Sequence, residues 1–203
     1  MEQNINQIKV RGQLVDLPEF SHENHGKRFY RFHLDIPRLS GNTDCLPIVA
    51  EERILDEIDL SGGSLLTVIG QIRSHNTRIG GMRHLLIFIF AQQIVAEDGE
   101  ACNDVIIEGP LCKEPIYRRT PLGREICDGM LAVKRNFRRA DYLPCIFWGR
   151  TAEEVSLCHT GDCIRITGRL QSRTYIKRTE EGQFQRVAYE ISALTAEITH
   201  QEI

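Results

Sequence analysis

An internal repeat is the feature that most limits what this chain can fold into. When the sequence is shifted by 97 positions, its two halves align over roughly 40 residues without a gap. A shift of 98 then pairs residues 68–74 (VIGQIRS) with residues 166–172 (ITGRLQS). We therefore predict two copies of one domain, over residues 1–98 and 103–203, joined by a short polar linker. The aligned pairs include Leu14 with Leu111, Pro18 with Pro115, Gly26 with Gly123, and Asp44 with Asp141.

Each copy has the element order of an OB-fold barrel. Five segments of the second copy are apolar or alternating and are predicted as strands: residues 105–111, 125–133, 142–148, 163–175 and 184–194. After the third segment, Thr151 with Glu154 three residues later predicts a capping box at a helix start. Gly168 predicts a bend, and in the first copy a helix is expected at about residues 51–58. We therefore expect an all-β protein of two tandem OB-fold, five-stranded Greek-key barrels, each with one short helix between strands 3 and 4.

The composition is that of a soluble globular protein, with 41% hydrophobic and 26% charged residues. The longest apolar run, residues 85–91, is too short to cross a bilayer, and the polar N-terminus carries no export signal. The seven cysteines are an odd number without a CxxC pair, which favours reduced thiols in the cytoplasm. Because no structural zinc spacing and no nucleotide motif occur, we expect no metal, no cofactor and no membrane contact.

Two segments of the second copy resemble one known family. Residues 141–153 (DYLPCIFWGRTAE) resemble the third strand and the helix start of bacterial single-stranded DNA-binding proteins, and residues 161–175 (GDCIRITGRLQSRTY) resemble the fourth strand. The resemblance covers about residues 103–198, whereas the first copy shares it only through the internal repeat and residues 70–74. It implies the OB fold and non-catalytic binding of single-stranded DNA.

The resemblance also implies a set of base-stacking aromatic residues. Binding of single strands without sequence preference uses flat aromatic faces, because every base has a π-face. The four positions at which the family stacks bases hold Phe137, Tyr142, Trp148 and Tyr175. Aromatic residues make up only 7% of the chain, so their presence at all four positions favours the binding interpretation. The alternative stays open that Tyr142 and Trp148, which have the same parity on one strand, face a core.

Basic residues surround these aromatic positions. Residues 113–139 hold eight basic and three acidic side chains, a net charge of +5. Cations of this kind contact phosphates, and binding through them weakens steeply with salt. The alternative is that the run is only a solvated, charged face. The predicted phosphate-binding residues are Lys134, Arg135, Arg138, Arg139, Arg150, Arg169 and Arg173, with Lys177 and Arg178 extending the positive surface.

The first copy lacks this site. The four aromatic positions fall on Ser40, Cys45, Glu51 and Thr77. Residues 1–102 carry a net charge of −4 and residues 103–203 one of +1, so the total of −3 hides a difference between the halves. We therefore predict that the first copy is mainly a scaffold for assembly. Phe29, Tyr30 and Phe32 leave a residual contact with nucleic acid open, although a core position is favoured for Tyr30 and Phe32.

The expected function follows from the site and the resemblance. We predict a non-catalytic protein that binds single-stranded DNA in the replication, recombination or repair of bacterial DNA, in the cytoplasm and associated with the nucleoid. Stacking and phosphate contacts barely distinguish DNA from RNA, so RNA stays open as a partner. Because the family assembles four barrels, the tandem chain implies a homodimer.

A second interpretation is an OB-fold assembly module, such as a primosome accessory protein, that binds nucleic acid weakly. The sequence ends at Ile203 without the acidic tip through which many members of the family recruit replication or repair enzymes. We therefore do not expect such proteins to be recruited by the usual route. No nucleophile and base stand at catalytic spacing, so we expect no enzyme activity.

Overall fold

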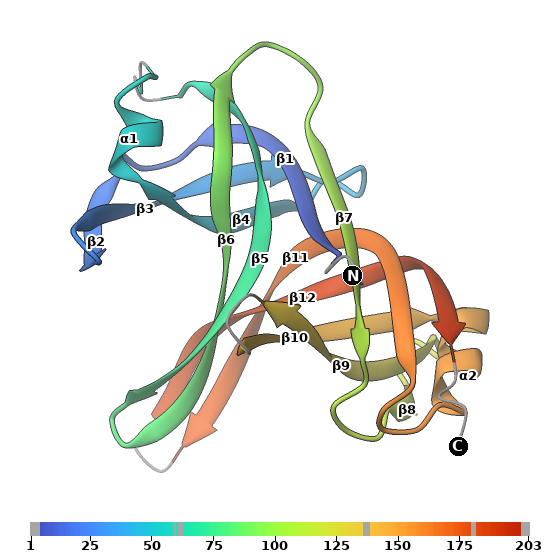
Figure 1. Ribbon diagram of the computed structural model, residues 1–203. Helices are drawn as coiled ribbons and strands as arrows, with labels where there is room; N and C mark the ends of the chain where they lie inside the picture. Colours follow the sequence, from blue (N-terminus) through green and yellow to red (C-terminus); the bar gives the residue numbers. More distant parts are fainter. Residues whose placement is uncertain (1–4, 59, 61–62, 136–138, 180–181, 200–203) are drawn as a thin grey trace.

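The computed structural model describes residues 5–58, 60, 63–135, 139–179 and 182–199 (Figure 1). The first domain contains β1 (Asn6–Leu14), β2 (Glu19–Asn24), β3 (Lys27–Pro37), β4 (Thr43–Glu51), α1 (Glu52–Leu55), β5 (Leu65–Ile79) and β6 (Met82–Ala96). The second domain repeats this order with β7 (Cys102–Pro110), β8 (Ile116–Arg119), β9 (Glu125–Arg135), β10 (Arg139–Trp148), α2 (Gly149–Ser156), β11 (Cys163–Thr179) and β12 (Gly182–Thr199). Within these residues, no helix is long and apolar enough to span a membrane.

Five strands of each domain close into a barrel. In the first domain, β1 pairs with β5, β5 with β6, β6 with β4 and β4 with β3. The ring closes where Leu14 of β1 pairs with Leu34 of β3. The equivalent closure of the second domain is a bridge between Leu111 and Leu131. The predicted pair of tandem OB-fold barrels is therefore confirmed.

Alternation along the strands fills each barrel with apolar side chains. In β1, Ile8, Val10 and Leu14 are at most 4% exposed, whereas Lys9 and Gln13 between them are exposed. Phe32 and Phe147 are the largest fully buried side chains, one in each barrel. The core position favoured for Phe32 is thus confirmed.

Glycines allow the long hairpins to bend over the barrels. The pairing of β11 with β12 shifts by a bulge between Thr167 and Gly168, which confirms the predicted bend. A Cβ atom on Gly168 would lie 2.3 Å from the carbonyl oxygen of Ser192. Gly70 of the first domain is in the same situation, because its Cβ atom would lie 2.2 Å from the carbonyl oxygen of Phe90.

Three local features differ from the sequence prediction. Each domain has a sixth strand, β2 or β8, that pairs only with β3 or β9, and every residue of both short strands is exposed. These strands therefore lack the apolar alternation by which the others are recognised. Helix α1 is limited to Glu52–Leu55. Helix α2 follows Trp148 directly and has no side-chain capping bond. The capping box predicted at Thr151 is therefore wrong, because Thr151 already lies in the first helical turn.

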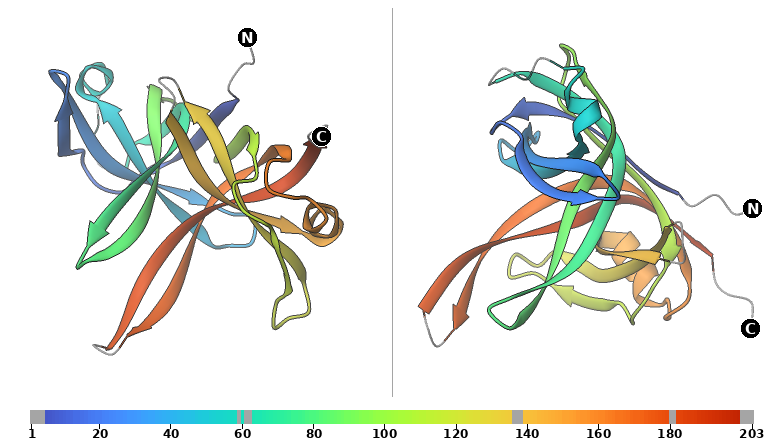
Figure 2. Two further views of the ribbon diagram at one scale, coloured as in Figure 1. Left: turned by 60° about the horizontal axis from the view of Figure 1, so that its bottom comes forward. Right: turned by 60° about the vertical axis from the view of Figure 1, so that its left-hand side comes forward.

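The two barrels join edge to edge through their first strands. β1 and β7 pair antiparallel, which unites all strands in one 12-stranded sheet. Ile8 pairs with Val105, which is its own counterpart in the repeat. Because equivalent residues face each other, an approximate two-fold axis relates the domains. The β5–β6 and β11–β12 hairpins consequently extend to the same side of the molecule (Figure 2).

Each long hairpin is hydrogen-bonded to one buried carboxylate of the opposite barrel. Asp44 of the first domain accepts a hydrogen bond from Arg38 Nε at 2.7 Å and one from the main-chain N–H of Ser172 at 2.7 Å. Its counterpart Asp141 accepts the main-chain N–H of Ser74 from the first domain, also at 2.7 Å. Asp44 is 1% and Asp141 0% exposed. The two domains are therefore held by reciprocal polar contacts as well as by strand pairing.

We expect Asp44→Ala to lower the free energy of unfolding by about 3 kcal/mol. The substitution removes the shared acceptor of Arg38 and Ser172 at the domain junction, and polar groups left unpaired there are costly. Urea unfolding measures the change. Asp98→Ala, at an exposed position between β6 and β7, is the control and should change stability by less than about 0.5 kcal/mol. Equal stability of the two variants would contradict the anchoring role of Asp44.

Candidate nucleic-acid interface

Three of the four predicted stacking residues are described, and all three are open to solvent. Tyr142 is 41%, Trp148 37% and Tyr175 39% exposed. The alternative that Tyr142 and Trp148 face the core is therefore excluded. Along β10 the barrel is filled instead by the intervening residues, such as Leu143. Phe137 lies outside the described residues.

The indole of Trp148 is held at one edge. Its Nε1–H donates to Ser192 Oγ on β12 at 3.0 Å. Ser192 pairs with Arg169 of β11, so these two side chains lie on the same face of the hairpin. The buried Nε of Arg169 has no hydrogen-bond partner among the described residues. The surface beside Trp148 therefore contains an unused cationic donor.

The β11–β12 hairpin continues this surface to Tyr175. Residues two apart on a strand share a face, which places Arg169, Arg173 and Tyr175 in one row about 20 Å long. The guanidinium carbon of Arg173 lies 5.7 Å from the centroid of the Tyr175 ring, in a cation–π contact. We call this surface the hairpin face: Trp148, then Arg169, Arg173 and Tyr175 of β11, with Ser192, Glu190, Ala188 and Arg186 on β12.

One buried carboxylate lies within the hairpin face. Glu190 is 8% exposed, and its Oε1 lies 3.5 Å from Nε of Arg173. Burial raises the pKa of Glu190 above its ordinary value, and the positive charge of Arg173 opposes this shift. The ionised carboxylate offsets part of the charge of Arg173, which is a predicted phosphate ligand. Glu190 therefore limits the attraction of this face for phosphate.

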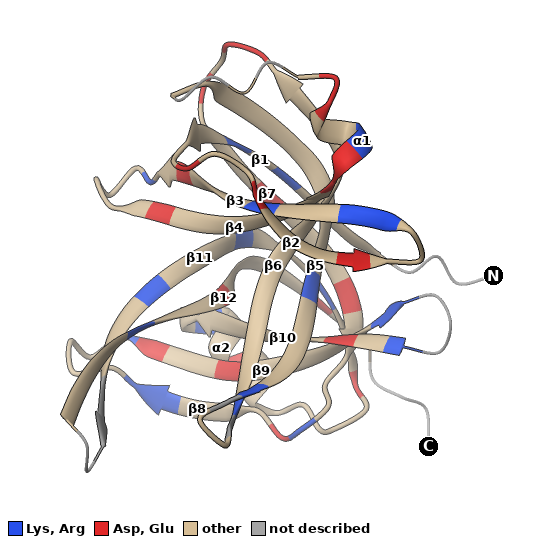
Figure 3. Ribbon diagram, turned by 90° about the vertical axis from the view of Figure 1, so that its left-hand side faces the viewer, with Lys and Arg blue, Asp and Glu red and all other residues tan. Residues whose placement is uncertain are grey.

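The basic residues at the β9–β10 turn have different surroundings. Arg135 Nε lies 2.9 Å from Oδ2 of Asp141, so its charge is compensated within the domain junction. Lys134 and Arg139 are exposed near the ends of β9 and β10, and Figure 3 marks the basic residues of the strands in blue. Arg138 lies outside the described residues. Of the described residues at this turn, Lys134 and Arg139 are thus the better placed to meet a phosphate.

Arg150 flanks Trp148 from helix α2. Its side chain is 89% exposed, and its Nε donates to Oε1 of Glu154 at 2.9 Å. An exposed ion pair between residues four apart on a helix contributes little, so Arg150 can exchange this partner for a phosphate. The side chains of Lys177 and Arg178 lie outside the described part of the chain.

The first domain has a different surface at the equivalent place. Glu51 occupies the position of Trp148, and its Oε2 accepts a hydrogen bond from Lys27 Nζ at 3.0 Å. Tyr30 is half-buried against the core, as favoured from the sequence, and Phe29 is 7% exposed. A carboxylate therefore replaces the stacking ring at a central position of the site.

No group of three or more His, Cys, Asp or Glu side chains is placed to hold a metal ion in the part of the chain that the structure describes. None of the cysteines in this part forms a disulfide. Burial raises the pKa of Cys45 to about 12 and that of Cys127 to about 11, so these thiols are poor nucleophiles.

Two serines that position the aromatic residues are not evident from the sequence. Ser192 holds the indole of Trp148, and Ser74 Oγ of the first domain accepts the main-chain N–H of Tyr142 at 2.8 Å. The alignment of Ser74 with Ser172 in the repeat is the one signal that could have identified Ser74. The first domain therefore contributes to the geometry of the second domain's site.

Comparison with known proteins assigns this geometry to a family. The protein-family model described as "Single-strand binding protein family" matches residues 102–199, which form the second domain. Over 87 residues the chain is 38% identical to Single-stranded DNA-binding protein B of Bacillus subtilis (strain 168), a match that covers 39% of this chain and 75% of that protein. The chain belongs to the single-strand binding protein family.

Two further matches show how far the likeness extends. Single-stranded DNA-binding protein A of Bacillus subtilis (strain 168) is 39% identical over 92 residues, 42% of this chain and 51% of that protein, so the match spans about half of that relative. The wild-type single-stranded DNA binding protein from Thermus aquaticus superposes with a TM-score of 0.78 at 23% identity, covering 98% of this chain and 95% of that chain. That likeness shows the fold alone, and it includes both barrels.

We expect Glu190→Gln to tighten the binding of dT oligonucleotides roughly two- to fivefold, or about 0.4–1 kcal/mol, because it releases Arg173 from a negative neighbour. The raised pKa of Glu190 means that this carboxyl gains its proton as the pH falls through the acid range. Affinity of the unmodified protein should therefore approach that of the variant at low pH. Fluorescence anisotropy at pH 5 and pH 8 measures both effects. Glu154→Gln serves as control, and weaker binding by Glu190→Gln would instead assign Glu190 to orienting Arg173.

Proposed function

We propose that this member of the single-strand binding protein family binds single-stranded DNA, without sequence preference and without catalysis. The observation that carries the proposal is the hairpin face, where exposed aromatic rings and arginines lie together in the domain that the family model matches. Rings of this kind stack on any base, and the cations follow the phosphates. Such a surface suits the binding of a single strand.

The aromatic rings supply most of the affinity that survives at high salt. Tyr142, Trp148 and Tyr175 each stack on a base, worth about 1–3 kcal/mol per base. Phe137 joins them, as the family resemblance implies. Arg135 has a smaller part than its neighbours because Asp141 already binds it. The phosphate contacts come from Lys134, Arg138, Arg139, Arg150, Arg169 and Arg173.

The two domains have different roles in binding. Two chains assemble into one particle. Residues 1–98 act mainly as the scaffold, and residues 103–203 hold the strand. The fold match to the Thermus aquaticus protein supports the tandem arrangement. A homodimer then presents four barrels. We place the protein in the cytoplasm, on the nucleoid, in DNA replication, recombination or repair; the bacterial single-stranded DNA-binding proteins to which it is similar support the role in DNA binding.

A second candidate function is an OB-fold assembly module that binds nucleic acid only weakly. It differs from the first in one measurable respect, because its binding would survive the loss of Trp148. The exposure of Trp148 and the family of the second domain favour the first candidate.

We expect dT oligonucleotides to quench the fluorescence of Trp148, which is the one tryptophan of the chain. A stacked base contacts the indole directly, and released counterions make the affinity fall steeply between about 50 and about 200 mM salt. A fluorescence titration over this range measures both effects. Unchanged fluorescence at low salt would refute the proposed function.

We expect Trp148→Ala to weaken binding by about 1–3 kcal/mol, or roughly 5- to 150-fold, and Trp148→Phe to retain most of the affinity. Anisotropy of a labelled dT oligonucleotide measures the change without the tryptophan signal. Tyr117→Ala is the matched control, since Tyr117 is 40% exposed on β8, outside the hairpin face. Affinity that survives in Trp148→Ala would favour the assembly module.

A further inference from the structure

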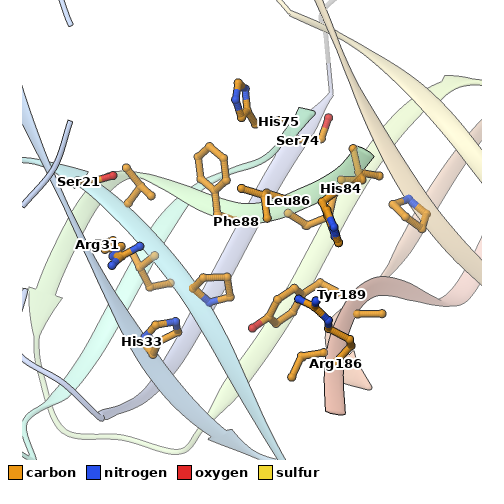
Figure 4. A pocket seen from close by; sticks show the side chains of 18 of the residues that line it. Ser21, Arg31, His33, Ser74, His75, His84, Leu86, Phe88, Arg186 and Tyr189 are labelled. Atoms are coloured by element: carbon orange, nitrogen blue, oxygen red, sulfur yellow. The ribbon is translucent and has the colours of Figure 1, made fainter. Parts of the chain in front are cut away.

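A groove of about 1040 Å³ runs between the two barrels (Figure 4). Strands β2, β3 and β4 form one side of it, and the β5–β6 and β11–β12 hairpins, with Arg135 of β9 and Pro144 of β10, contribute the rest. None of the described residues that line it is an aspartate or a glutamate, although the chain has 28 acidic residues. The lining includes four arginines and four histidines. A groove with this composition attracts anions.

Two buried nitrogen atoms in the lining are unsatisfied. His84 Nε2 on β6 and Arg186 Nε on β12 have no hydrogen-bond partner among the described residues. Figure 4 shows that these two side chains enter the groove from different hairpins. A guanidinium nitrogen is always a donor, so the buried Nε of Arg186 requires an acceptor that this part of the chain does not supply.

Some of the positive charge in the groove is compensated from outside it. Nδ1 of His33 lies 2.8 Å from Oδ2 of Asp16, and Nη2 of Arg31 lies 3.5 Å from Oε2 of Glu19. Arg135 is bound by the buried Asp141, as described above. The Arg31–Glu19 pair is exposed on both sides and contributes little. Arg83 and Arg186 add two further positive charges to the groove. Because no described lining residue is a carboxylate, the net charge of the lining is positive.

The groove begins where the hairpin face ends. Tyr175 and Arg186 are cross-strand partners on the hairpin face, and both also line the groove. A strand stacked along Trp148 and Tyr175 therefore enters the groove without leaving the surface. Inside, Phe88 and Tyr189 offer further rings, so the groove combines stacking surfaces with cations.

We propose that this groove, which we call the junction groove, is a second binding segment for the same single strand and leads it from Tyr175 onto the first domain. The proposal rests on the proposed function and extends it. Phosphodiester anions satisfy the donors of Arg83 and Arg186, and bases lie against Phe88 and Tyr189. The first domain thus acts as more than a scaffold, because β3 and β6 supply Arg31 and Arg83.

The edge of the groove along β2 fits the same ligand. The rings of His22 and Phe29 stack at 4.9 Å with an interplanar angle of 12°. Next to them on β2, Phe20 is 52% exposed, and the guanidinium carbon of Arg28 lies 5.4 Å from the centroid of its ring. Phe29 is buried beneath His22, so the exposed rings of His22 and Phe20, with Arg28 beside Phe20, form the stacking surface for bases that leave the groove.

The test compares short and long strands. Arg31→Gln combined with Arg83→Gln removes two charges from the first-domain wall and leaves the hairpin face unchanged. Lys9→Gln combined with Arg53→Gln is the charge-matched control, since both residues are exposed in the first domain and do not line the groove. The ligands are dT oligomers of about 8 and about 30 nucleotides, the first within the range of a single barrel and the second beyond it.

We expect the groove variant to bind the short oligomer like the unmodified protein. Its affinity for the long oligomer should fall about tenfold at low salt, and its salt slope should fall by roughly 1.4, corresponding to two lost phosphate contacts. The control variant should change neither quantity by more than about twofold. Circular dichroism and urea unfolding confirm that both variants fold.

Two outcomes would overturn the inference and leave the proposed function standing. One is unchanged long-oligomer affinity in the groove variant, with Trp148 still quenched. The other is binding of polyglutamate that the groove variant loses while it keeps its oligonucleotide affinity, which would assign the groove to an acidic protein segment. Absent quenching of Trp148 in the unmodified protein would instead refute the proposed function itself, so the two failures are distinguishable.

Discussion

Six residues of β1 pair with β7 across the approximate two-fold axis, and the geometry of both domains follows from this contact. The pairing covers the exposed edge that the first strand of each barrel would otherwise present to water. It also sets the direction in which each long hairpin leaves its own barrel. The β5–β6 hairpin reaches Asp141 through Ser74, and the β11–β12 hairpin reaches Asp44 through Ser172. The junction groove lies between these hairpins, so it exists only because the two barrels are joined in this way.

The repeat has kept its buried polar contacts and lost its surface chemistry, and burial explains the difference. Asn6 accepts the main-chain N–H of Ile72 at 2.9 Å, and its counterpart Asn103 accepts that of Leu170 at 3.0 Å. A buried amide or carboxylate of this kind cannot be changed alone without leaving its partner unsatisfied. The position of Trp148 is less restrained, because its ring is partly exposed although it donates to Ser192, and the first domain holds Glu51 there.

The sequence predicts those features that depend on pattern and leaves out those that depend on tertiary contact. Alternation and repeat identify both barrels, and the need for close backbone approach identifies the bend at Gly168. The short strands β2 and β8 escape detection because they bury no side chain. Arg135 looks like its neighbours in a basic run, yet the fold places it against the buried Asp141. The repeat alone distinguishes it from Arg139, because Arg38 and Asp44 of the first domain form the same pair, whereas Asn42 stands at the position of Arg139.

Net charge is a poor guide to where a domain attracts an anion. The half of the chain that carries −4 supplies a wall of a groove whose described lining has no carboxylate. Asp16 and Glu19 lie at the edge of the groove, where they pair with His33 and Arg31, and other acidic residues are paired away from it, as Glu51 is with Lys27 and Glu52 with Arg28. A phosphate near the groove responds mainly to charges within a Debye length, about 8 Å at physiological ionic strength, and hardly to the sum over the domain. The local arrangement of Arg31, Arg83 and the histidines therefore decides the attraction, and an acidic domain can still guide a polyanion.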